Sequence, residues 1–320
     1  MTRYIMRRCL QALILLFFLS IAMFALIHLL PGGADAVFLN PRLSAAGRAA
    51  IRARFGLDQP VYIQYLKWLG SALTGNFGFS FATNQPVTDI LAQRFPNTME
   101  LFIPALLLAL ILAIGIGVIS GVRQGTLTDY TLTTLSYFGI SMPIFLFALL
   151  SQDIFGVTLH WLPTSGTATY GYTFDFFNTV LDRVLHLILP ASVLAITFVA
   201  GWSRYMRSSM IDVVKQDYMR TARAKGVSSA RLLMRHGLRN AIIPLITIVA
   251  LDLGQIAGGA AITEGIFAWP GMGSLFIDSL EGRDFPVLLA MLLLAGTFVI
   301  AFNLIADILY AVVDPRIRYS

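Results

Sequence analysis

The sequence has few charged residues for its length. Charged side chains make up 12% of its 320 residues, whereas a soluble domain of this size carries about 25%. So little charge cannot cover the surface of one or two soluble domains, and 57% of the residues are hydrophobic. The composition therefore excludes an ordinary soluble enzyme and a disordered protein, and it favours a protein that lies largely in lipid.

Cysteine and histidine are also scarce. Cys9 is the single cysteine, which excludes an internal disulfide and a secreted disulfide scaffold. The four histidines are scattered and form no cluster with metal-ligand spacing; they are His28, His160, His186 and His236. We therefore expect this chain to hold no metal.

Lysine is rarer still, and its positions bear on nucleotide chemistry. None of the three lysines follows a loop of the form G-x-x-x-x-G-K-[ST], so the chain lacks the phosphate-binding loop of common ATPases. The motifs G-x-S-x-G and H-E-x-x-H are absent as well. We expect a non-catalytic protein that binds no cofactor, and any uphill transport must draw its energy from an ion gradient or from a partner.

The chain has long apolar runs instead. A membrane helix needs about 20 apolar residues. Six stretches reach that length, at 9–30, 98–122, 130–157, 185–203, 241–263 and 287–313. The first is too long for a signal peptide and is interpreted as an uncleaved helix. The sequence thus predicts an all-α polytopic protein with one transmembrane domain over residues 1–320.

The basic residues predict the orientation of these spans. Of the 23 Lys and Arg residues, 15 fall on the side that holds both termini and the loop 204–240. The positive-inside rule places that side in the cytoplasm. The opposite side holds residues 32–97, where we expect a short helix with one apolar face near Tyr62–Leu69 and a turn at Gly75–Gly78. The net charge of +6 is read as a topology signal, and nucleic acid is not expected as a partner.

Few polar groups lie inside the predicted spans. Asp252 is the carboxylate near the centre of one, and it is compatible with an interhelical hydrogen bond, contact with a transport pathway, or a proton relay. Pro143 should bend the third span. The pairs Gly117/Gly121 and Gly254/Gly258 have the spacing of close helix packing. The candidates for lining a pathway are Ser141, Pro143, Asp252 and Gln255.

The loop 204–240 has the pattern helix–glycine–helix. Ile211, Val214, Tyr218 and Ala222 recur at helical spacing. Gly226 fits a left-handed helix end, and Ser228 or Ser229 can begin a second helix. A short rigid unit of this kind can transmit motion from a cytoplasmic partner. The same basic residues also suit a topology determinant that binds anionic lipid, and the pattern alone favours neither.

Several segments together resemble a known family. The strongest covers Tyr218-Met219-Arg220-Thr221-Ala222-Arg223-Ala224-Lys225-Gly226, followed by Arg235–Pro244. Further similar segments are Gly56–Pro60, Gly75-Asn76-Phe77-Gly78-Phe79-Ser80, Trp161-Leu162-Pro163, Phe267–Gly273 and Val313–Tyr319. In order and spacing they resemble ABC-importer permeases of the dipeptide, oligopeptide, nickel and glutathione branch, along nearly the whole chain.

The resemblance implies the fold of a type I ABC importer permease in the bacterial inner membrane. It implies four partners in addition to membrane lipid: a homologous second permease, two cytoplasmic ATPases that bind ATP and Mg, and an extracytoplasmic solute-binding protein. It also implies that Tyr218, Arg220, Thr221, Ala222, Lys225 and Gly226 belong to the loop that couples to the ATPases. The general motif of that loop is E-A-A-x-x-x-G. Only Ala222 and Gly226 match it here, and Arg220 stands in the place of the glutamate, so Arg220 needs a different partner group.

The leading hypothesis is therefore the membrane-spanning subunit of an ATP-driven importer of dipeptides, oligopeptides or a related solute such as glutathione or a nickel complex. The alternative is a secondary transporter or channel that works alone. Ion-coupled transporters usually place several ionisable groups near the midplane. This sequence offers one, which favours the first hypothesis.

Overall fold

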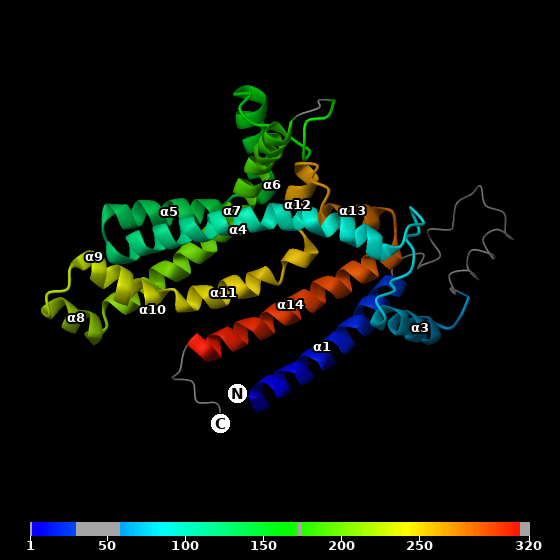
Figure 1. The fold of residues 1–320 in the computed structure, drawn as a ribbon, viewed down its shortest axis with the longest axis horizontal. Helices are drawn as coiled ribbons and strands as arrows, with labels where there is room; N and C mark the ends of the chain where they lie inside the picture. The colour runs from blue at the N-terminus through cyan, green and yellow to red at the C-terminus, as the bar shows by residue number, and fades with distance from the viewer. Residues whose placement is uncertain (1, 30–57, 172–174, 314–320) are drawn as a thin grey trace. The chain divides into compact units, whose positions relative to one another are not determined.

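A computed structural model of the chain describes residues 2–29, 58–171 and 175–313. The described residues form helices and connecting turns, with a single isolated β-bridge between Phe79 and Pro86, and Figure 1 shows the helices as coiled ribbons. The motif residues Gly56 and Leu57 lie outside the described residues, as do residues 32–57 of the expected outer loop and the C-terminal residues after Val313.

The described helices follow one another along the chain. In order they are α1 Thr2–Leu29, α3 Val61–Leu73, α4 Val87–Val122, α5 Leu127–Ser141, α6 Ile144–Ser151, the π-helix η2 Gln152–Thr158, α7 Phe176–Val214, α8 Asp217–Ala224, α9 Ser229–Arg231, the π-helix η3 Leu232–Leu238, α10 Arg239–Ala241, α11 Ile243–Leu253, the 3-10 helix η4 Ile256–Gly258, α12 Ala261–Ile266, α13 Met272–Glu281 and α14 Phe285–Val313.

Membrane spans can be assigned by length and polarity. Four single helices, α1, α4, α7 and α14, contain windows long and apolar enough to cross a bilayer, and two bent helix pairs bring the number to as many as six within the described residues. Such a set agrees with the all-α polytopic fold expected from the apolar runs. The helices are longer than the runs: α4 begins at Val87 rather than near 98, and α7 covers Phe176–Val214 rather than 185–203.

Proline and glycine interrupt two of the expected spans. The third breaks where Met142 is extended and Pro143 takes the N-cap position of α6, as expected for a proline that lacks a backbone donor. The fifth does not continue to residue 263, because α11 ends at Leu253. Gly254 and Gly258 therefore do not lie on one helix face, and the packing motif predicted for them is wrong.

The chain divides into two compact units, and α4 and α14 contribute residues to both. The first unit comprises residues 1–98, 254–261 and 270–301. Its core includes a cluster of buried residues from α4, α13 and α14, among them Val87, Met272 and Met291. The turn after α3 is also fixed here: the Asn76 side chain accepts a hydrogen bond from the Gly78 amide at 3.0 Å, and Gly75 and Gly78 both have positive φ.

Asp284 joins that turn to the start of α14 within the first unit. Its side chain is almost fully buried and accepts hydrogen bonds from the Ser80 hydroxyl and from the Phe81 amide, the latter at 3.0 Å. A buried carboxylate is costly unless such donors surround it. This arrangement explains why a serine ends the Gly75–Ser80 motif.

The second unit comprises residues 99–253, 262–269 and 302–320. Within it, α4 and α7 pack closely where glycines face methionines: a Cβ at Gly117 would lie 2.5 Å from Met206 Cβ, and one at Gly121 would lie 2.7 Å from Met210 Cβ. The close helix packing predicted from the Gly117/Gly121 spacing is therefore confirmed.

An ion pair fixes the N-terminal part of α7 in the same unit. The Arg183 guanidinium donates to both carboxylate oxygens of Glu100, at 2.7 and 2.6 Å. Its Cζ also lies 5.3 Å from the ring centroid of the buried Trp269. Two parallel hydrogen bonds and an aromatic face are the contacts that arginine makes best.

Candidate functional site

The loop 204–240 forms three helical pieces, which are the end of α7, the short helix α8, and the continuous segment of α9, η3 and α10. Helix α7 continues through Arg204 to Val214, a turn at Lys215 and Gln216 follows, and α8 then runs from Asp217 to Ala224. Figure 1 shows α8 and α9 beyond the end of α7. The expected helix–glycine–helix order is confirmed. The continuous helix expected from Ile211 to Ala222 is wrong, because Gln216 adopts an extended conformation (ψ 148°).

Gly226 ends α8 in a left-handed conformation, as predicted. Its φ is +78°. Its amide donates to the Arg223 carbonyl at 3.0 Å, and the Val227 amide donates to the Ala222 carbonyl at 3.3 Å. This pair of bonds defines a Schellman motif, which satisfies the carbonyl groups left open at a helix end. Ser228 then takes the N-cap position of α9 without a side-chain hydrogen bond.

One side of α8 is anchored to the helices around it. Met219 is buried at 2% exposure. A Cβ at Gly237 of η3 would lie 3.0 Å from the end of Met210 and 3.5 Å from the end of Met219, so α7, α8 and η3 meet at these methionines. The Asn240 amide donates to the Tyr218 hydroxyl at 3.1 Å. Helix α8 is therefore held on this side by contacts with α7, η3 and α10, and it can move together with α7.

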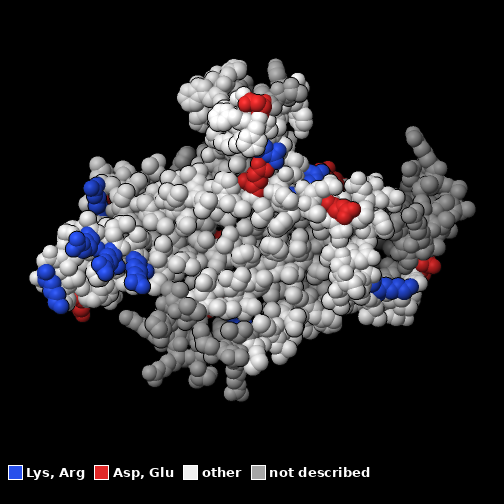
Figure 2. Space-filling model, in the orientation of Figure 1, with Lys and Arg blue, Asp and Glu red and all other residues white. Residues whose placement is uncertain are grey.

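The other side of α8 is exposed and basic. The Arg220 side chain is 72% exposed and lies 3.5 Å from Asp217, an exposed pair of a kind that adds little stability. Thr221, Lys225 and Gly226 are exposed as well. Six exposed basic residues lie along the loop from α8 onward: Arg220, Arg223, Lys225, Arg231, Arg235 and Arg239. Figure 2 shows Lys and Arg side chains gathered over the region of α8 and α9.

The residues considered for a transport pathway lie on different elements. Ser141 is the last residue of α5, and its hydroxyl donates to the Tyr137 carbonyl at 2.9 Å. Pro143 follows it at the break before α6. Gln255 takes the N-cap position of η4. Ser141 and Pro143 belong to the second unit and Gln255 to the first, and their role in a pathway stays a prediction.

Asp252 lies near the end of α11 and faces α7. The indole N–H of Trp202 donates to its Oδ2 at 2.7 Å, and Trp202 is itself 2% exposed. The interhelical hydrogen bond considered for this carboxylate is therefore present. Its partner could not be identified from the sequence, because the two residues are 50 positions apart.

Another ion pair, with a buried carboxylate, joins α5 and α7 and was not predicted from the sequence. Arg207 of α7 donates to both oxygens of Asp129 at 2.7 Å, and Asp129 is 1% exposed. Asp129 also accepts from the Gly125 amide at 2.9 Å. The spacing of Thr126 and Asp129 is that of a helix start and signals α5, whereas nothing local signals Arg207. Within the described ranges, no group of three or more metal-ligating side chains is present.

Comparison with known proteins gives two family matches, one for each part of the chain. Residues 113–319 match the family "Binding-protein-dependent transport system inner membrane component". Residues 1–102 match its N-terminal family, "Binding-prot-dependent transport system membrane comp, N-term".

Curated relatives match over the full length. The oligopeptide transport system permease protein AppB of Bacillus subtilis is 44% identical over 320 residues, which is 100% of both chains. A putative peptide permease protein of Brucella suis is 42% identical over 323 residues, again covering both chains. The glutathione transport system permease protein GsiC of Escherichia coli K12 is 38% identical over 320 residues and 100% of both.

Proposed function

The chain belongs to the inner-membrane components of binding-protein-dependent transport systems, and from this premise we propose that it imports peptides and couples to separate ATPases through α8. Its place as a multi-pass permease subunit of an ABC importer in the inner membrane follows from the family and from the apolar helices. The substrate, the individual partners and the coupling residues are the proposed part.

The substrate class is proposed from the named relatives. Two of them are called oligopeptide or peptide permeases, and a third is a glutathione permease. Glutathione is itself a small peptide, so the three names share peptide chemistry. We therefore place peptides first as the transported class, and the assembly would contain a second permease and a solute-binding protein on the outer side.

The observation that carries the coupling role is the two-sided character of α8. One side is attached to α7 and to the segment 232–240 through the buried Met219 and through the hydroxyl of Tyr218. Its other side presents Arg220, Thr221 and Lys225 to solvent. A partner that displaces the exposed side of a short helix held in this way also displaces the membrane-spanning helix to which the short helix is attached. ATP and Mg would bind the ATPase partners, and both chain termini would lie on the same, cytoplasmic side.

Arg220→Glu tests the coupling role. The side chain is exposed, so the substitution reverses the charge offered to a partner without disturbing the buried side of α8. We expect the affinity for the ATPases to fall about tenfold, equal to ~1.4 kcal/mol, with loss of substrate-stimulated ATP hydrolysis. The measurement is copurification of the ATPases, followed by hydrolysis and peptide uptake in reconstituted membranes.

Arg231→Glu is the matched control, since it makes the same charge change on an exposed residue of the same loop outside α8. Equal losses in both variants would show that the basic loop acts only through its total charge. Full coupling in Arg220→Glu would remove α8 from the mechanism.

A further inference from the structure

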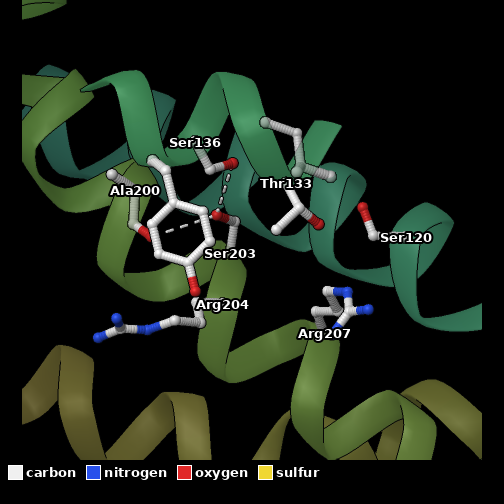
Figure 3. Close-up of a pocket in the computed structure, with 9 residues that line it drawn as sticks. Ser120, Thr133, Ser136, Ala200, Ser203, Arg204 and Arg207 are labelled. Atoms are coloured by element: carbon white, nitrogen blue, oxygen red, sulfur yellow. Dashed lines mark hydrogen bonds between the residues drawn. The ribbon is translucent and has the colours of Figure 1, made fainter. Parts of the chain in front are cut away.

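A small polar cavity lies between α4, α5 and α7 in the second unit. Its volume is about 40 Å³, enough for a few atoms the size of a water molecule. Figure 3 shows side chains from the three helices around it. The polar ones are Ser120 from α4, Thr133, Ser136 and Tyr137 from α5, and Ser203, Arg204 and Arg207 from α7.

Ser120 is the unusual member of this set. The residue is 1% exposed, and its hydroxyl has no hydrogen-bond partner among the described residues. The neighbouring hydroxyls are engaged: Ser203 donates to Ser136 at 3.2 Å, and Thr133 donates to Asp129 at 3.2 Å. A buried hydroxyl without a partner is costly, so Ser120 indicates that a polar atom from outside the chain belongs in the cavity.

The charge of the cavity is positive. Arg207 is neutralised by its two bonds to Asp129. Arg204 is exposed and lies 5.9 Å from the Tyr205 ring, and within the described residues no carboxylate forms an ion pair with it. The Ser120 hydroxyl is therefore a free donor in the cavity. The Arg204 side chain, which extends away from Ser120 in Figure 3, supplies the positive charge at its edge. A free hydroxyl and a guanidinium both suit an anionic oxygen group.

An apolar groove of about 230 Å³ adjoins this cavity. The two share Ile116, Ser136 and Ala200, so the polar cavity and the apolar groove lie directly beside one another. Most of the groove is lined by hydrocarbon side chains of α5, α6 and α7 that include Leu135 and Val193. An apolar cavity of about 150 Å³ holds a benzene ring, so this groove can take a longer piece of hydrocarbon.

We propose that the cavity and the groove together bind one anionic phospholipid, with the headgroup phosphate at Ser120 and Arg204 and one acyl chain along the groove. The dimensions agree with this occupant. Arg204 and Val193 are eleven residues apart on α7, a rise of ~16 Å along a helix. One leaflet of a bilayer core is about 15 Å thick, so a lipid chain runs from the polar end to the far end of the groove.

A transported peptide fits this site less well than a lipid does. Each peptide unit carries an N–H and a C=O that need partners when they leave water. The groove offers few, because Thr197, one of its polar members, already donates to the Leu194 carbonyl at 2.6 Å. An acyl chain has no such requirement. The site is therefore distinct from the peptide pathway, and the proposal does not depend on which solute is imported.

The test uses the full-length chain within the assembled transporter, purified into nanodiscs of phosphatidylcholine. A phosphatidylglycerol with a photoreactive group on one acyl chain is added at low level, and cross-linked residues are located by mass spectrometry. We expect labelling of groove residues such as Leu135 and Phe138. Unlabelled phosphatidylglycerol should compete, while phosphatidylcholine and inorganic phosphate should not.

Two variants with matched controls separate the two ends of the site. Arg204→Gln should lower labelling about tenfold, the effect of losing one charged hydrogen-bond donor, whereas Arg231→Gln should not. Thr197→Phe fills the groove and should also prevent labelling, whereas Val180→Phe changes an exposed position of α7 outside the groove and should not.

Three results would overturn the proposal. The first is labelling of the groove that is equal in Arg204→Gln and in the native chain. The second is displacement by inorganic phosphate, which would assign the polar cavity to the free anion. The third is labelling of the isolated chain that disappears in the assembled transporter, which would show that another subunit covers the groove.

Discussion

Gly226 and Gly259 both have a positive φ, in very different surroundings. Their φ angles are +78° and +73°. A Cβ at Gly226 would meet no atom within 4 Å, whereas one at Gly259 would lie 2.1 Å from the backbone nitrogen of Gly273. Gly226 is needed for the chain to turn, and Gly259 is needed both for a turn and for two backbone segments to touch. A turn can be predicted from the local sequence, but a close contact between two backbone segments cannot.

The largest effect that this comparison predicts is that of Gly259→Ala. The added Cβ meets backbone atoms, which cannot rotate away. Gly259 also has φ 73° and ψ 174°, a region essentially restricted to glycine that costs other residues about 1–3 kcal/mol. We expect the first unit to lose its packing at Gly273 and the yield of monodisperse protein to fall severely. The measurement is size-exclusion chromatography and thermal unfolding in detergent.

Gly265→Ala is its control, because Gly265 lies in α12 and a Cβ there would meet nothing within 4 Å. That variant should fold normally. A Gly259→Ala protein with the melting temperature of the native chain would show that the two segments can separate without cost.

The next effect concerns α4, which carries two glycines with opposite surroundings. A Cβ at Gly117 would lie 2.5 Å from Met206 Cβ, whereas one at Gly115 would meet nothing within 4 Å. Gly117→Ala should destabilise the protein by about 1–3 kcal/mol through overpacking. Gly115→Ala should stabilise it slightly, because alanine is a better helix former than glycine. Thermal unfolding of both variants gives the comparison, and equal melting temperatures would contradict close packing at Gly117.

The sequence predicted features that depend on neighbours along the chain. The short helix near Tyr62–Leu69 is present as α3, the turn at Gly75–Gly78 forms, and Gly226 ends a helix. The close packing at Gly117 and Gly121 was also predicted, because small residues one turn apart on a long apolar helix face a partner helix.

The sequence did not predict features that depend on distant residues. Gly254 and Gly258 have the same spacing as Gly117 and Gly121, yet the helix ends at Leu253, so spacing alone does not show that a helix continues. Nothing local links Trp202 with Asp252, Arg207 with Asp129, or Ser80 with Asp284. The coupling residues were suggested by the family resemblance. Their exposure depends on which side of α8 faces the other helices, and the structure shows that this is the side of the buried Met219.

Asp252 provides a prediction of intermediate size. Asp252→Asn keeps an oxygen that can accept the Trp202 N–H bond at this position, so folding should be nearly unchanged. Asp252→Leu removes the acceptor and leaves a buried donor without this bond, at a cost of about 1–3 kcal/mol. Thermal unfolding and peptide uptake of the two variants separate stability from transport. A well-folded Asp252→Asn protein that takes up no peptide would give the carboxylate a role in the pathway.

The smallest effect on stability is expected at Gly226 itself. Valine is disfavoured at a φ of +78° by about 1–2 kcal/mol, but the turn is exposed and no neighbouring atom blocks a Cβ. Gly226→Val should therefore fold and insert normally, but it should change the direction of α8. Copurification of the ATPases should then be weakened or lost, and substrate-stimulated hydrolysis should be lost. Gly226→Asn is the matched control, since asparagine tolerates the left-handed conformation and should keep most of the coupling. If the valine variant couples as well as the asparagine variant, the orientation set by this Schellman turn is not what the ATPases recognise, and the basic residues after Gly226 are better interpreted as determinants of topology.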